Sequence, residues 1–87
     1  MQETKQQKIE RLEREIPAKL ATRTTLSIVQ MYEIINLKLD VIKDGTERAI
    51  HLYVLRFLND ELESRNAEAF DAFLDSNEKS PRKFFLA

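Results

Sequence analysis

The sequence predicts a mainly α-helical protein that folds as one small domain, residues 1–87, and three observations support this. The chain contains only one glycine and two prolines, whereas turn-rich all-β domains use many more. Apolar side chains recur at spacings of three and four residues, which is the period of one helix face. Charged residues make up 33% of the chain, but a hydrophobic share of 43% is enough for a core and separates the chain from disordered segments.

Composition also limits the surroundings and the assembly of the protein. The chain has no cysteine, which fits a reducing compartment, and we expect a cytoplasmic protein. Residues 1–14 are charged and lack the apolar region of a signal peptide. No run approaches the ~20 apolar residues that span a membrane. The polar faces of the amphipathic helices are acidic or mixed, which argues against binding to a membrane surface, so we expect no membrane contact. A chain of this size buries only about 60–65% of its unfolded surface, and we expect a homodimer that enlarges the core.

Residues 1–16 predict an N-terminal helix, because most of them are strong helix formers. Ile9, Leu12 and Ile16 form one narrow apolar stripe along it. Pro17 is expected to end this helix, because proline disfavours the helical conformation of the residue before it.

Residues 22–28 are rich in β-branched side chains and predict a short strand or extended segment. Successive side chains of a strand face opposite ways. The inward set is Thr24, Leu26 and Ile28, and the outward set is Arg23, Thr25 and Ser27. The alternative is a loop that leads into the next helix, with Ser27 as its N-cap and Gln30 completing a capping box.

A central helix is predicted from residue 28 to 43, since one apolar face repeats at spacings of 4, 3, 4 and 3. That face consists of Ile28, Tyr32, Ile35, Leu39 and Ile42, and Ile34 and Val41 begin a second one. Apolar residues also alternate along the chain next to Asp44-Gly45. Residues 35–42 and 49–56 could therefore form a β-hairpin instead, which would make the protein α+β. The helical pattern is roughly twice as long, so we expect helix.

Gly45 is expected to end that helix as its C′ residue, where a left-handed conformation costs glycine little. Thr46 would then cap a second central helix. Apolar side chains occur on almost every side of residues 47–63, and such a helix is usually buried on every side. A lone chain of 87 residues has little to cover it with, so we expect a partner subunit to do so.

The C-terminal third of the chain separates into an acidic part, which overlaps the end of the predicted core at residues 22–63, and a basic tail. Residues 66–75 predict a short amphipathic helix, and residues 57–78 carry seven acidic side chains against Arg65 alone. Residues 79–87 are expected to form an extended tail. The tail either folds back and buries Phe84 and Phe85, or binds a partner as a peptide. A protein partner is therefore expected through residues 57–87.

No pattern in the sequence indicates catalysis, a cofactor or a metal site, and we expect a protein that is not an enzyme. His51 lies inside the most apolar helix, which indicates a core or interface histidine rather than a general base. Asp60, Glu61 and Glu63 would point to different sides of a helix, so they do not form a cation site.

The segment from residue 23 to 63 resembles the ribbon-helix-helix family of DNA-binding repressors. The resemblance lies in Arg23-Thr24-Thr25-Leu26-Ser27-Ile28, in Asp44-Gly45-Thr46, and in the helix predicted after each. In that family, two chains pair one strand each into an antiparallel ribbon that lies in the DNA major groove. The resemblance implies a small dimeric transcriptional regulator that binds double-stranded DNA.

The same resemblance implies roles for particular side chains. Arg23, Thr25 and Ser27 would face base edges, which arginine and hydroxyl side chains can recognise. Thr46 and Arg48 would lie near a phosphate at the N-terminus of the second helix, a favourable place for an anion. The expected dimer core comprises Leu26, Ile28, Ile35, Leu39, Ile50, Val54 and Phe57.

The second interpretation is a helical adaptor or inhibitor, of the phage or plasmid accessory type, that contacts proteins and binds no nucleic acid. A net charge of −1 favours it, because phosphate neutralisation supplies much of the affinity of DNA-binding proteins. This interpretation predicts continuous helix from residue 26 to 43 and no strand pairing.

Overall fold

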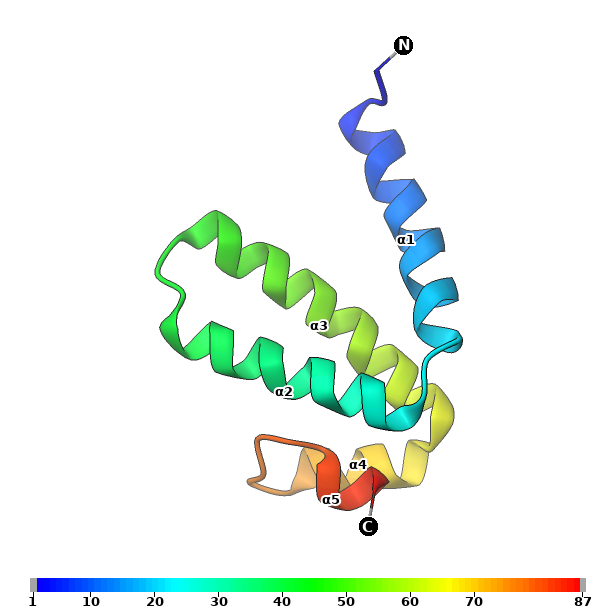
Figure 1. The fold of residues 1–87 in the computed structure, drawn as a ribbon, viewed down its shortest axis with the longest axis vertical. Helices are drawn as coiled ribbons and strands as arrows, with labels where there is room; N and C mark the ends of the chain where they lie inside the picture. The colour runs from blue at the N-terminus through cyan, green and yellow to red at the C-terminus, as the bar shows by residue number, and fades with distance from the viewer. Residues whose placement is uncertain (1, 87) are drawn as a thin grey trace.

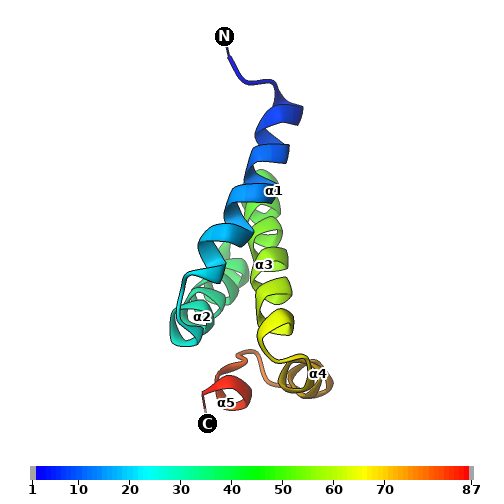
Figure 2. The same cartoon turned by 90° about the vertical axis from the view of Figure 1, so that its right-hand side faces the viewer.

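The computed structural model describes residues 2–86, which form five helices. They are α1 (Lys5–Ala21), α2 (Thr25–Val41), α3 (Gly45–Arg65), α4 (Ala67–Asp75) and α5 (Arg82–Phe85). α2 and α3 form an antiparallel hairpin. α1 packs on α3, and its N-terminal half extends away from the hairpin (Figure 1). Figure 2 shows that α4 and α5 lie together at the end opposite the N-terminus. Met1 and Ala87, parts of the expected first helix and tail, lie outside the described residues.

α1 begins with a capping box and continues past its proline. Thr4 Oγ1 accepts a hydrogen bond from the Gln7 amide (3.1 Å), and Gln7 Oε1 accepts one from the Thr4 amide (3.0 Å). The expected end at Pro17 is wrong, since the helix runs to Ala21. Proline removes one intrahelical hydrogen bond, but the longer helix places Leu20 in the core, only 4% exposed. Packing of Leu20 therefore outweighs the local preference of the proline.

The strand expected at residues 22–28 is wrong, and with it the ribbon on which an intertwined dimer would depend. The described residues contain no strand. α2 starts at Thr25, and its N-cap Thr24 accepts a hydrogen bond from the Ser27 amide (3.1 Å). The strand-like alternation of side chains spans only a few residues, whereas the helical repeat of apolar residues continues to Val41. The longer helical pattern therefore determines the structure of this segment. The mainly helical class is confirmed, although Thr24 rather than Ser27 caps the helix.

The two expected central helices are present, but their connection differs from the expected one. Asp44 is the N-cap of α3, and its Oδ1 accepts hydrogen bonds from the amides of Thr46 (2.8 Å) and Glu47 (3.3 Å). Gly45 is the first residue of α3, and no described glycine has a positive φ. The expectations of Gly45 as a C′ residue and of Thr46 as a cap are therefore wrong. Aspartate is the stronger N-cap, and the alternative β-hairpin is excluded because both of its segments are helical.

Replacing Gly45 by alanine is expected to stabilise the protein by about 0.5–1 kcal/mol. A Cβ added at Gly45 meets no atom within 4 Å, and the residue already lies in a helix without a positive φ. Alanine loses less conformational entropy than glycine on folding. Urea unfolding of the Gly45→Ala variant measures the change. A lower free energy of unfolding would instead indicate the left-handed turn that the sequence suggests.

The core lies where the hairpin, α4 and the end of α1 meet. Its buried side chains are Leu20, Ile28, Val29, Tyr32, Phe57, Leu58, Leu62, Phe70 and Phe73. Phe73 joins two parts of it, because its ring centroid lies 5.6 Å from that of Tyr32 and 6.0 Å from that of Phe84. The tail thus folds back: Phe84 and Phe85 are half-buried and pack against the core. The expectation of an extended tail is wrong at Arg82–Phe85, which form the short helix α5.

Candidate protein-interaction surface

α2 is apolar on two faces, and only one of them is covered. The inner face carries Ile28, Val29 and Tyr32, all buried. On the opposite side, four large apolar side chains fall within an arc of about 80° at the helical angle of ~100° per residue. These side chains, which we call the outer stripe, are Leu26, Ile34, Leu37 and Val41, exposed by 45, 52, 69 and 73%.

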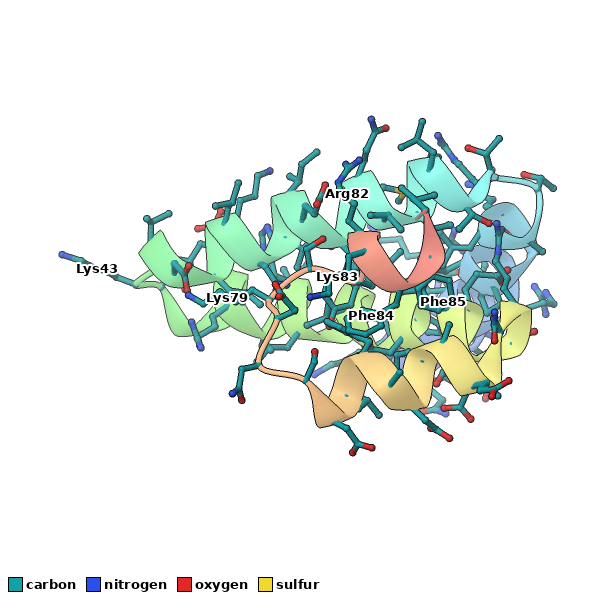
Figure 3. The ribbon with its side chains drawn as sticks, turned by 90° about the horizontal axis from the view of Figure 1, so that it is seen from below. Lys43, Lys79, Arg82, Lys83, Phe84 and Phe85 are labelled. Atoms are coloured by element: carbon teal, nitrogen blue, oxygen red, sulfur yellow. The ribbon has the colours of Figure 1, made fainter. Side chains whose placement is uncertain are left out.

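The outer stripe is a row of exposed apolar side chains and not a single exposed residue. Single exposed apolar side chains are normal on protein surfaces, whereas a contiguous apolar patch of several hundred Å² marks an interaction site. In the outer stripe only Gln30 interrupts the row of apolar residues along this face of α2. Figure 3 shows side chains of α2 that point away from all the other helices.

α3, which was expected to be buried on every side, is covered better than α2. α2 packs on one flank of α3 and α1 on another, and Ile50 and Leu52 remain 57% and 47% exposed near its N-terminal end. The expectation of burial on every side is therefore wrong for the N-terminal part of α3, and the longest row of exposed apolar side chains on the hairpin is the outer face of α2.

The C-terminal segment is attached along one edge of the outer stripe. Glu33 receives hydrogen bonds from Ser80 Oγ (2.6 Å) and from Arg82 Nη2 (2.7 Å). One turn further along α2, the Asn36 side chain donates to the carbonyl of Lys79 (2.7 Å). Figure 3 shows Arg82 beside α2, and Phe84 and Phe85 turned toward the interior. A hollow remains between this segment and Leu37 of the stripe.

Glu33 is expected to stay charged at unusually low pH. The hydrogen bond from Arg82, followed by that from Ser80, lowers the pKa of Glu33 to about 2 from an ordinary 4.5. A folded pKa below the unfolded value means that the contact stabilises the protein above pH 4.5 and weakens as the pH falls toward 2. A carbon-13 NMR titration of the Glu33 carboxyl measures this pKa.

The Arg82→Gln variant should raise the midpoint of that titration toward 4.5, because the strongest donor is lost. Lys83→Gln is the matched control, since Lys83 contacts Glu78 (3.3 Å) instead of Glu33. A titration midpoint near 4.5 for Glu33 in the unchanged protein would contradict the attachment of the C-terminal segment to α2.

The residues predicted to bind DNA are separated in the structure. Arg23, Thr25 and Ser27 lie at the start of α2, and Thr46 and Arg48 lie beyond its other end. The 17 residues of α2 place these groups about 25 Å apart, at 1.5 Å per residue. The amide of Thr46 already donates to Asp44, and Arg48 Nη1 donates to the carbonyl of Leu39 (2.8 Å).

Arg65 makes four hydrogen bonds, two of them to the first of these groups. Its Nη2 donates to the carbonyls of Arg23 (2.6 Å) and Leu20 (2.9 Å), and its Nη1 donates to Thr25 Oγ1 (3.1 Å). Its Nε donates to Glu61 (2.7 Å), and only 19% of the Arg65 side chain is exposed. Arg65 therefore ties the end of α3 to the connection between α1 and α2. The sequence gives no sign of this role, because Leu20, Arg23 and Thr25 lie 40 to 45 positions before Arg65.

The residues predicted as a dimer core divide between the inside and the outside of one chain. Most of them are buried or half-buried within the chain: Ile28, Ile35, Leu39, Val54 and Phe57. Leu26 and Ile50 are exposed, and only Leu26 belongs to the outer stripe. The rest of the stripe was missed, although the spacing of Ile34 and Val41 indicated a second apolar face.

The remaining chemical candidates do not assemble a site. His51 is half-buried, and its Nδ1 lies 2.8 Å from the carbonyl oxygen of Glu47, one turn earlier in the same helix. In the part of the chain that the structure describes, no group of three or more His, Cys, Asp or Glu side chains could hold a metal ion. None of the described helices has the length and apolar content to cross a membrane.

Comparison with protein-family models, with curated proteins and with solved structures gave no match for this chain.

Proposed function

We propose that this chain is a non-enzymatic helical protein-interaction module, an adaptor or inhibitor that contacts a protein with the outer stripe of α2. The carrying observation is that Leu26, Ile34, Leu37 and Val41 lie on one face of one helix and are each 45% or more exposed. Exposed apolar surface of this kind is unfavourable in water, at roughly 25 cal/mol per Å². Covering it with another protein surface recovers that free energy.

This proposal replaces the ribbon-helix-helix interpretation, for two physical reasons. Residues 22–28, which that interpretation needs as a strand, form a helix cap and the first turn of α2 in the described structure. In addition, the N-terminus of α3 is occupied by the carboxylate of Asp44, which would repel a phosphate.

Site-specific photo-crosslinking in cells that make the protein tests the proposal. A photoreactive amino acid at Leu37 should yield discrete protein adducts, whereas the same amino acid at Asp71, exposed on α4, should not. No adduct at Leu37 above the Asp71 control contradicts the proposal. Salt-dependent binding to duplex DNA that Arg23→Ala with Thr25→Ala abolishes would also contradict it.

A further inference from the structure

We infer that the outer stripe is covered by the outer stripe of a second copy of this chain, related by a two-fold axis. This inference rests on the proposed function and names the partner of the same surface. A two-fold dimer needs one self-complementary patch, and a row of apolar side chains on a single helix meets that need. Two such helices pack at interaxial distances of about 8–10 Å.

The exposed area of the lone chain supports a partner of this size. The structure exposes 6385 Å², whereas a compact monomer of 10.2 kDa exposes roughly 5300 Å². The difference, roughly 1100 Å², exceeds the ~800 Å² that each partner buries in a standard interface. The radius of gyration is 14.2 Å, against about 12 Å for a compact domain of this length. Part of this openness comes from α1, whose N-terminal half extends away from the hairpin (Figure 1).

The charges around the outer stripe also fit a second copy. By helical position, Glu33 and Asp40 lie along one edge of it and Lys38 lies along the other. Arg82 and Lys79 partly neutralise the acidic edge, with contacts of 2.7 Å to Glu33 and 3.9 Å to Asp40. The net charge of the chain is −1, so two copies repel each other weakly.

Molar mass in solution tests the inference, with the full chain alone in physiological salt. Sedimentation equilibrium should give about twice 10.2 kDa at the highest concentrations and should dissociate on dilution. Leu37→Glu with Val41→Glu should weaken the association at least ~100-fold, because two charges would enter an apolar contact. Leu74→Glu is the matched control, since Leu74 is 60% exposed but lies on α4.

A second measurement keeps the inference testable if the double variant fails to fold, which circular dichroism reports. The chain has no native cysteine, and Ile34 lies at the middle of the outer stripe. Two-fold packing that is centred on the outer stripe brings Ile34 near its own copy. Ile34→Cys should therefore oxidise to a covalent dimer much faster than Leu74→Cys.

Three outcomes overturn the inference: a chain that stays monomeric at all concentrations, association that Leu74→Glu disrupts and the double variant does not, or equal oxidation of the two cysteine variants. A monomeric chain whose Leu37 crosslinks to a different protein in cells overturns the inference and leaves the proposed function standing. A dimer that forms through another surface, with no adduct at Leu37, overturns both.

Discussion

Replacing Leu58 by alanine is expected to lower the free energy of unfolding by about 2–5 kcal/mol. Leu58 is 0% exposed in the core, so the substitution removes buried methyl groups and leaves a cavity. A domain of this length has a total stability of only about 4–13 kcal/mol. The variant should therefore unfold at least ~8 °C below the unchanged protein.

Leu74→Ala is the matched control for Leu58→Ala, since both change a helical leucine to alanine. Leu74 is 60% exposed, and its loss should cost less than about 1 kcal/mol. Urea unfolding of both variants at one fixed protein concentration measures the difference, because self-association adds a concentration-dependent term. Equal losses for the two variants contradict the position of Leu58 in the core.

Replacing Arg65 by methionine is expected to cost about 2–4 kcal/mol. The change keeps most of the side-chain volume but removes the donors to Leu20, Arg23 and Thr25. It also leaves the carboxylate of Glu61, only 16% exposed, without its cation. Removing one member of a largely buried ion pair is costly because the remaining charge stays desolvated.

Two further variants separate the role of Arg65 from the loss of any arginine. Arg48→Met removes a single hydrogen bond on an exposed side chain and should cost less than about 1 kcal/mol. Arg65→Lys keeps the charge but loses the planar fork that reaches several acceptors at once, so it should restore only part of the stability. If Arg65→Met and Arg48→Met cost the same, Arg65 does not hold α1, α2 and α3 together.

Periodicity predicted most of the fold correctly. The face of α2 that contains Ile28, Tyr32 and Ile35 is the inner one, and these side chains are buried or half-buried. The helix predicted at residues 66–75 is observed as α4, with Asn66 as its N-cap. These successes share a cause, since apolar residues three and four positions apart must face the same way in a helix.

The errors occur where a short local signal opposes a longer-range contact. Pro17 locally ends a helix, but burial of Leu20 by the rest of the chain favours its continuation. Thr46 was expected to cap α3, but Asp44, the stronger N-cap, takes that place two residues earlier. Alternating side chains around Thr25 suggested a strand, which would have needed a strand of a second chain to pair with. The helix that begins at Thr25 forms its hydrogen bonds within one chain and needs no such partner.

The candidate site was harder to predict than the fold. Both faces of α2 are apolar, and the sequence cannot show which of them the rest of the chain covers. That choice depends on where α3, α4 and the C-terminal segment pack, over separations of more than 40 positions between Glu33 or Asn36 and their partners. The outer stripe becomes evident only when the exposed fractions of Leu37 and Val41 are known.

Carbene footprinting over a dilution series tests most directly whether the outer stripe is a contact surface. A photolysed diazirine labels side chains according to their exposure, and mass spectrometry locates the label by residue. We expect labelling of Ile34, Leu37 and Val41 to fall as the protein concentration rises, while labelling of Leu74 stays constant. Constant labelling of the outer stripe at every concentration, or protection confined to other helices, would contradict self-association through α2.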